Sequence, residues 1–168
     1  MCEQPPYSLL VRAIETEVLP VCQRYGMGVI PWSPLAGGFL SGRYRKGGER
    51  MQSRRESILP ANFDMDLPDN QRKMDAVEEL AVLAEEAGMT LIELSLAFVI
   101  NHPAVTSAII GPRTMEHLES QLTSVDVKLT ADVLDRIDEI VPPGRTINPA
   151  DDGWPQNPWL QPSARRRA

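Results

Sequence analysis

The chain has 168 residues, the size of one domain, since domains commonly contain about 100–150 residues. Hydrophobic residues make up 42% and charged residues 24% of it, values near those of folded soluble proteins, which exclude a wholly disordered chain. The 17 Lys and Arg residues against 23 Asp and Glu residues give a formal charge of -6. This charge argues against a protein that binds nucleic acid or an anionic membrane.

The termini and the cysteines indicate the compartment. No apolar run in the sequence approaches the roughly 20 residues that span a bilayer, and the first residues lack the basic-then-apolar order of a signal peptide. We therefore expect a cytoplasmic protein with no membrane partner. Cys2, Cys22, His102 and His117 do not have the close spacing of a zinc site, so we expect reduced thiols and no metal.

The first predicted elements follow the order that is typical of parallel sheets, a helix and then a buried strand. Apolar residues with helical spacing predict a helix from about Glu15 to Arg24. Pro20 lies only about a turn inside it, so it either costs little or moves the start of the helix later. Gly26 and Gly28 interrupt this pattern. The apolar residues 29–33 then predict a short buried strand.

A long polar segment, residues 43–69, comes next and is predicted to be a loop, of the length that usually forms a functional lid or a disordered insertion. Apolar residues at i, i+3 and i+4 predict a helix over Asn70–Gly88, with Gly88 as a left-handed stop. Thr90 and Glu93 form a capping box for the next helix, residues 91–102, whose apolar sequence predicts burial.

The last third of the chain repeats the order strand, turn and helix. Residues 106–110 predict a second buried strand, and residues 114–122 predict the helix after it. Thr130 caps a final amphipathic helix. The apolar face of that helix consists of Val133, Leu134, Ile137 and Ile140. We expect one domain over residues 1–141 and a Pro-rich, partly disordered tail over residues 142–168.

The turn after the second predicted strand has the chemistry of an anion site. The helix that begins near Thr114 offers unpaired backbone N–H groups, Gly111 lets an anion approach the backbone, and Arg113 adds a planar cation. These groups suit a phosphate. The alternative is an ordinary strand-to-helix turn with a solvated Arg113.

The segment after the first predicted strand, residues 32–38, lies where parallel α/β folds place ligands. Trp32 offers a flat face for stacking on a planar ring, Ser33 offers a hydroxyl, and Gly37 and Gly38 allow close backbone approach. The alternative is a Trp32 that fills the core beside an ordinary turn.

A carbonyl reductase also needs a proton donor of tuned pKa, usually Tyr or His supported by a cation or carboxylate. The sequence spacing gives no such set of companions to Tyr7, Tyr25 or Tyr44. His102 and His117 are expected at a helix end and on a surface. We therefore assign no catalytic residue within this chain.

Three stretches of the chain carry a family resemblance: residues 4–10 (QPPYSLL), residues 28–44 (GVIPWSPLAGGFLSGRY), and residues 107–114 (SAIIGPRT) with the nearby His117, Leu118 and Gln121. In order and spacing they resemble the C-terminal part of an aldo-keto reductase, in the branch that includes the potassium-channel beta subunits. The resemblance covers about Gln4 to Ile140. That family folds as a (β/α)8 barrel, which takes about 250 residues. The resemblance implies an α/β fold, a partial (β/α)8 TIM barrel of about the last three strand–helix units plus a C-terminal tail.

The same resemblance implies NADP(H) as cofactor and places the family's catalytic residues in the part of the barrel that precedes these units. Gln4 would meet the nicotinamide carboxamide, and Trp32 would stack on the nicotinamide ring. The residues implied along the pyrophosphate and its covering loop are Ser33, Leu35, Ala36, Gly38 and Arg43. The residues implied around the adenosine and its 2′-phosphate are Gly111, Arg113, His117 and Gln121. His117, Ser120 and Gln121 depart from the residues usual in the family, so NAD(H) is not excluded, although Arg113 favours a phosphate.

The sequence therefore predicts the C-terminal portion of an NAD(P)H-dependent reductase that converts a small aldehyde or ketone to an alcohol. The alternative is a non-catalytic module that binds nucleotide or associates with a partner. Exposed sheet edges and an apolar face would favour self-association or contact with the missing N-terminal half. Two copies completing one barrel is the less favoured arrangement, because they supply six strands rather than eight.

Overall fold

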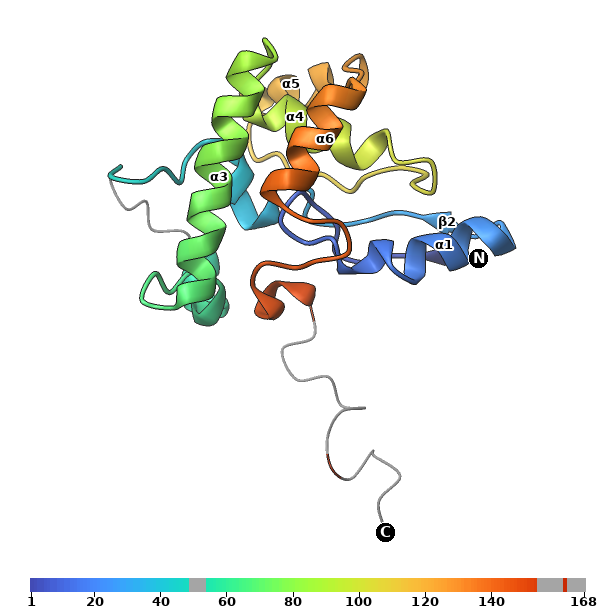
Figure 1. The fold of residues 1–168 in the computed structure, drawn as a ribbon, viewed down its shortest axis with the longest axis horizontal. Helices are drawn as coiled ribbons and strands as arrows, with labels where there is room; N and C mark the ends of the chain where they lie inside the picture. Colours follow the sequence, from blue (N-terminus) through green and yellow to red (C-terminus); the bar gives the residue numbers. More distant parts are fainter. Residues whose placement is uncertain (49–53, 154–161, 163–168) are drawn as a thin grey trace.

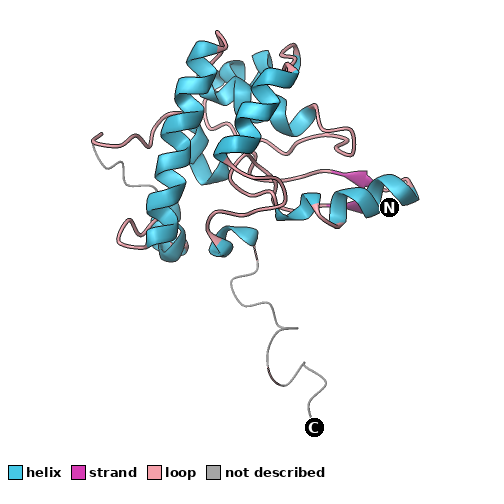
Figure 2. Cartoon of the chain, viewed as in Figure 1, coloured by secondary structure: helices cyan, strands magenta, loops and turns pink. Residues whose placement is uncertain are grey.

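The computed structural model describes residues 1–48, 54–153 and 162, and within them the chain is α/β and mostly helical (Figures 1 and 2). The α-helices are α1 (Val18–Tyr25), α2 (Arg54–Ile58), α3 (Pro68–Glu86), α4 (Leu91–Ile100), α5 (Met115–Leu122) and α6 (Ala131–Ile140). The strands are β1 (Cys2–Glu3) and β2 (Gly28–Val29). The 3-10 helices are η1 (Ala13–Glu15), η2 (Ala36–Ser41), η3 (Pro60–Asn62), η4 (Thr123–Val125) and η5 (Pro149–Asp152).

Three parallel segments form one side of the molecule. β1 and β2 pair in parallel, and the arrangement continues past them in single bridges from Trp32 to Pro6 and to Ile109. The amide of Thr106 donates to the carbonyl of Val29, with a donor–acceptor distance of 2.8 Å. Residues 2–6, 28–32 and 106–109 therefore lie side by side in that order, and we call them the strand wall.

The wall is more exposed than the sequence predicted. Val29 is fully buried, but Trp32 is 37% exposed and Ile109 is 40% exposed. The expected buried strand at residues 106–110 is wrong in this respect, since Thr106 and Ser107 are exposed as well. The reason is pairing: among the described residues, this segment bridges only to residues 28–32, and a strand becomes buried through neighbours that cover its edges and faces.

The four helices from α3 to α6 pack together beside the wall, and their sequence signals are confirmed. α3 buries Val77 and Leu80 completely, and Gly88 behind it has the left-handed φ of +71°. The predicted capping box is present, with the Thr90 hydroxyl accepting from the Glu93 amide at 3.1 Å and a Glu93 carboxylate oxygen accepting from the Thr90 amide at 2.8 Å. We call α3, α4, α5 and α6 together the helical layer.

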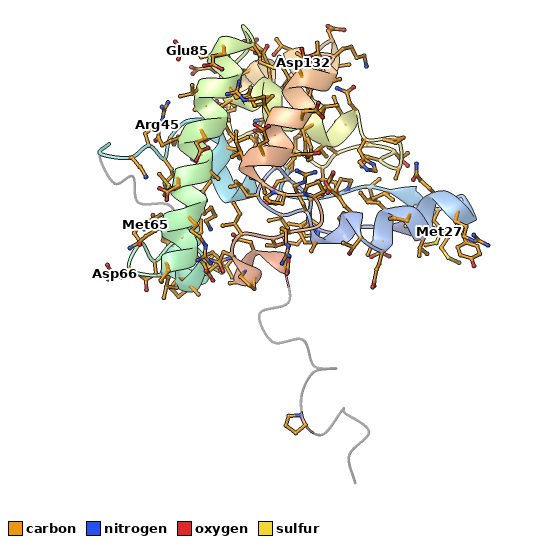
Figure 3. All side chains as sticks on the ribbon, in the orientation of Figure 1. Met27, Arg45, Met65, Asp66, Glu85 and Asp132 are labelled. Atoms are coloured by element: carbon orange, nitrogen blue, oxygen red, sulfur yellow. The ribbon has the colours of Figure 1, made fainter. Side chains whose placement is uncertain are left out.

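α3 and α6 lie next to each other in this layer. Figure 3 shows Glu85 near the end of α3 and Asp132 near the start of α6 at the same end of the molecule, and Arg136 of α6 pairs with Glu86 of α3 at 3.4 Å. α6 directs Ile137 into the core, whereas Leu134, expected on the same face, is 39% exposed. α1 begins at Val18, so Pro20 lies in its first turn as the sequence allowed.

Part of the expected tail is packed on the core. The amide of Arg12 donates to the carbonyl of Arg145 at 3.0 Å, and the amide of Ile147 donates to the carbonyl of Leu10 at 3.2 Å. Asn148 is 4% exposed. Residues 142–153 thus belong to the folded body, and residues 154–161 and 163–168 of that tail lie outside the described residues. No helix of the described ranges is long and apolar enough to cross a membrane.

Candidate functional site

The two segments singled out in the sequence leave the strand wall at the same edge. Residues 28–32 and 106–109 run parallel, and Trp32 bridges to Ile109, so the residues that follow both segments begin next to each other. α4 packs against both η2 and α5, which hold much of these two segments. Residues 33–43 and 111–121 are therefore neighbours in space, and we call them the first and second site segments.

A side-chain contact joins the two site segments directly. Nη2 of Arg43 lies 3.1 Å from Nε2 of His117. A guanidinium can only donate, so Nε2 of His117 is the acceptor in this contact. Residues 74 positions apart in the chain thus meet on one surface.

The first site segment has a strained backbone. Ser33 and Ala36 have φ of 59° and 48° and are the non-glycine residues with positive φ in the described part of the chain. Gly37 and Gly38 follow with φ of 70° and 106°. Left-handed conformations of non-glycine residues cost free energy and cluster at functional sites, which marks this turn as a candidate.

The amides of this turn are largely occupied within it. The Gly37 amide donates to the Ser33 hydroxyl at 3.1 Å, and the Ala36 amide donates to the Ser33 carbonyl at 2.8 Å. The Gly38 amide donates to the Leu35 carbonyl, also at 2.8 Å. Donors for a bound anion would therefore come mainly from side chains such as Arg43.

Trp32 is not a core residue. Its ring is partly exposed, and it lies close to the end of the described C-terminal segment, since a Cβ added to Gly153 would be 3.1 Å from Cζ2 of the indole. Gln4, which is exposed, follows β1 in the neighbouring segment of the wall. A half-exposed indole at this edge can offer a stacking surface to a planar ligand.

Arg43 and Arg113 are exposed cations at this edge, and within the described residues neither has a carboxylate partner. Four other arginines form ion pairs with acidic side chains: Arg12, Arg45, Arg72 and Arg136. Arg45, for example, pairs with Glu78 at 2.7 Å. Gly111 beside Arg113 has open space where a side chain would be. Cations without a carboxylate partner, beside a backbone that a ligand can approach, suit an anion.

The second site segment also contains an unsatisfied polar group. Gln121 is 9% exposed, and its Oε1 is buried without a hydrogen-bond partner in the described structure. Thr114 caps α5 by accepting from the His117 amide at 3.2 Å. An orphaned buried acceptor is costly unless something donates to it, so Gln121 is suited to a ligand N–H.

The sequence analysis missed a buried polar network around Tyr7. The Tyr7 hydroxyl donates to Glu15 at 2.7 Å, and Arg12 pairs with Glu15 at 2.9 Å and with Asp138 at 2.8 Å. Burial, and then the Glu15 carboxylate, raises the pKa of Tyr7 far above its usual value. The ring is fully buried, so this tyrosine is out of reach of a substrate and unsuited to donate a proton. The spacing of Arg12 and Glu15 was the available signal, but the partner in α6 is far away in the chain.

His102 lies edge-on to this network, with its ring centroid 5.9 Å from that of Tyr7. Burial lowers its pKa, and its Nδ1 accepts from the Ala104 amide at 3.1 Å. It therefore lies just after the end of α4 as a structural residue, as expected. The described residues contain no group of three or more His, Cys, Asp or Glu side chains arranged to hold a metal ion.

Comparison with known proteins decides the family. Residues 1–142 match the model of the Aldo/keto reductase family. The chain belongs to this family. The family predicted from the sequence motifs is thereby confirmed.

Its relatives are longer proteins. The chain is 36% identical over 140 residues to the protein named "Uncharacterized oxidoreductase YrpG" of Bacillus subtilis, a match of 83% of this chain and 40% of that protein. It is 36% identical over 143 residues to an Arabidopsis thaliana protein named "Probable voltage-gated potassium channel subunit beta", with 83% and 43% covered. The chain thus spans about two fifths of the length of these relatives.

A solved structure supports the fold. The structure of a glycerol dehydrogenase from Gluconobacter oxydans matches this aldo-keto reductase chain with a TM-score of 0.69 and 23% identity, over 82% of this chain and 41% of the other. At this identity the likeness concerns the fold alone.

Proposed function

We propose that this chain is the C-terminal, cofactor-binding portion of an NAD(P)H-dependent oxidoreductase that reduces an aldehyde or ketone to an alcohol. In this proposal the strand wall provides the last three strands of a (β/α)8 barrel. Membership of the aldo-keto reductase family and an oxidoreductase relative support it. The observation that carries it is the contact between Arg43 and His117, which joins two segments that follow parallel strands.

The side chains at this edge fit a dinucleotide. Arg43, Arg113 and His117 offer donors to phosphate oxygens, and the orphaned Oε1 of Gln121 can accept from an amino group. Trp32 offers the stacking surface for a planar ring. Two arginines without carboxylate partners favour NADP(H), which carries an additional phosphate, over NAD(H).

The nicotinamide, when bound, supplies the hydride. The residues of this chain would bind and orient the cofactor: Trp32 would flank the ring, Gln4 would meet its carboxamide, and the cations would hold the phosphates. Proton donation to the carbonyl oxygen falls to groups outside this chain, because Tyr7 is buried and Tyr25 precedes β2, at the opposite end of residues 28–32 from Trp32. The ring of Tyr44, the third tyrosine, is stacked on that of Phe39, with ring centroids 4.6 Å apart.

The test is calorimetric titration of the purified chain with NADPH and NADH. We expect measurable binding of NADPH, weaker binding of NADH, and a loss of roughly tenfold or more in NADPH affinity for Arg43→Ala, since hydrogen bonds to charged groups contribute about 1.5–3 kcal/mol. Arg24→Ala is the matched control, because Arg24 is an exposed arginine on α1 without an ion-pair partner in the described chain. No NADPH binding, or an equal loss in both variants, would contradict the proposal.

A second measurement tests where the chemistry resides. The chain alone should show no NADPH-dependent reduction of a carbonyl substrate above a reaction without protein. Turnover by the chain alone would show that its proton donor is among its own residues.

A partner-binding module is the second candidate function. The observation that favours it is the exposure of large apolar side chains: Ile109 in the wall is 40% exposed, and Met115 at the start of α5 is 67% exposed. Such a module would self-associate or bind further polypeptide. Sedimentation velocity separates the two candidates, since a stable monomer at high concentration would count against self-association.

A further inference from the structure

The C-terminal strap, residues 146–153, connects the helical layer to Trp32. It begins at Thr146, which bridges antiparallel to Val11, and it ends at Gly153 beside the indole. Between these two points, side-chain contacts join the strap to α3 and to the turn before α3. These contacts hold both its middle and its end.

The first anchor of the strap is a buried ion pair. Lys73 of α3 has a side chain that is 1% exposed, and its Nζ lies 2.9 Å from Oδ2 of Asp151. Nζ also donates to the carbonyl of Asn62 at 2.7 Å, and Nδ2 of Asn62 donates to Oδ1 of Asp151 at 2.6 Å. Both oxygens of the strap's carboxylate are therefore held. Burial lowers the pKa of Lys73, and the charge of Asp151 opposes this.

The same lysine touches the first site segment. Its Nζ lies 4.1 Å from the centroid of the Phe39 ring in η2, a cation–π distance. Phe39 follows Gly38 directly in the strained turn. The Lys73–Asp151 ion pair, which we call the latch, thus contacts the turn that follows Trp32.

The second anchor is a buried amide pair. Asn148 is 4% exposed, and its Nδ2 donates to Oδ1 of Asn70 at 2.6 Å. Oδ1 of Asn148 accepts from the Ala150 amide at 2.9 Å and so begins η5. Buried amides satisfied on both sides fix the position of the chain that carries them.

The end of the strap lies against the indole. Gly153 has a φ of +79°, and a Cβ added to it would lie 3.1 Å from Cζ2 and 3.5 Å from Cη2 of Trp32, and 3.6 Å from Cγ of Pro6. The backbone of Gly153 thus lies beside the six-membered ring, with no room for a side chain between them, while the indole as a whole remains 37% exposed. A side chain at a wall edge with open neighbours would otherwise be free to change rotamer.

We propose that the strap is a positioning element: latched by Lys73 and Asp151, it holds the Trp32 indole in the orientation that stacks on the nicotinamide ring. This role rests on the proposed function. Holding the indole before the cofactor arrives removes the entropic cost of ordering it on binding. Trp32 is the residue that contacts the cofactor; Gly153, Asp151 and Lys73 act through it.

The test compares two ligands that share the adenosine half, of which only one carries the nicotinamide half. NADPH contains the nicotinamide, whereas 2′,5′-ADP contains only the adenosine and its phosphates. Gly153→Ala adds a methyl group against the indole, and Asp151→Asn removes the charge from the latch. We expect each variant to bind NADPH roughly three- to tenfold more weakly, the scale of one immobilised side chain, with 2′,5′-ADP affinity changed less than about twofold.

Gly88→Ala is the matched control. Gly88 has a φ of +71° and nothing within 4 Å of an added Cβ, so it imposes the same backbone strain far from the indole. It should leave both affinities unchanged. An unchanged or increased NADPH affinity in Gly153→Ala would overturn the positioning role, and so would an equal loss for both ligands. Failure of the unmodified chain to bind either ligand would overturn the proposed function and the positioning role with it.

A measurement without ligand gives an independent test. The indole N–H resonance of Trp32, assigned by its loss in Trp32→Phe, should shift in Gly153→Ala and in Asp151→Asn but not in Gly88→Ala. An identical resonance in all of these variants would show that the strap does not set the indole's position.

Discussion

The helical layer and the strand wall differ in how far their structure is determined locally. Three helices of the layer begin at a threonine whose side chain accepts a backbone N–H: Thr90, Thr114 and Thr130. The wall has only four residues in its two strands, and its third segment is held by one described bridge and by hydrogen bonds to Val29 and Pro31. A helix satisfies its backbone within itself, whereas a strand depends on neighbours at both edges.

The two regions also differ in how far their own residues bury one another. The layer contains fully buried residues such as Val77, Leu80 and Leu94, while Trp32 and Ile109 of the wall remain partly exposed. The proposed site lies on the strand wall, the less buried of the two regions. We therefore expect substitutions in the two regions to differ in their effect on the free energy of unfolding.

The largest effect is expected where the two regions are joined. Arg12, which is 4% exposed, follows the first wall segment and pairs with Glu15 and with Asp138 of α6. Arg12→Ala removes a buried guanidinium that joins Glu15, Asp138 and the Val141 carbonyl, and we expect a loss of about 3–5 kcal/mol in the free energy of unfolding. Urea denaturation measures it.

The control for this variant is Arg24→Ala, an exposed position where we expect a change within about 0.5 kcal/mol. A loss below about 1 kcal/mol in Arg12→Ala would show that the two regions are not coupled through this network.

The next effect compares one apolar residue from each region. Leu94 of α4 is 0% exposed, and Ile109 of the wall is 40% exposed. Leu94→Ala removes a fully packed side chain and should cost about 2–5 kcal/mol of unfolding free energy, whereas Ile109→Ala should cost about 1 kcal/mol or less. Chemical denaturation of both variants under one set of conditions gives the difference. Equal losses would mean that the wall is as well packed as the layer.

The smallest effect is a pH dependence within the layer. Hydrogen bonds from the Thr90 amide, from the Thr90 hydroxyl and from Thr123 lower the pKa of Glu93 below its usual value. The carboxylate therefore stabilises the fold above the pKa of an unfolded glutamate, near 4.3, and this contribution is lost as the pH falls through the lower folded pKa. The expected size is about 1 kcal/mol or less.

Glu93→Gln isolates this contribution. The stability difference between the unmodified chain and the variant should be largest near pH 6 and should shrink toward pH 3, as measured by thermal unfolding across that range. A difference that stays constant with pH would assign the effect to packing rather than to charge.

The contrast between the regions also explains what the sequence could predict. The apolar spacing of α3 and the capping box of α4 are local patterns, and both elements were predicted within a few residues. The burial of residues 106–110 was predicted wrongly because burial of a strand depends on segments elsewhere in the chain. The packing of residues 142–153 was missed for a related reason, since Lys73 and Asp151 are 78 positions apart.

The features of the candidate site also fall into those that the local sequence predicts and those that depend on tertiary contacts. The chemistry of Trp32, Gly111 and Arg113 could be inferred from residue types and from their places after predicted strands. The proximity of Arg43 to His117 and the unsatisfied Oε1 of Gln121 depend on tertiary packing. The family resemblance selected these residues, but their contacts required the structure.

The most direct test of the central claim, that the two site segments form one dinucleotide-binding surface, is a titration of the isotope-labelled chain with NADPH followed by amide NMR. We predict saturable shifts concentrated in residues 32–43 and 111–121, with the outer faces of α3 and α6 unaffected. Saturating NADPH that shifts only one of the two segments, or neither, would contradict the account.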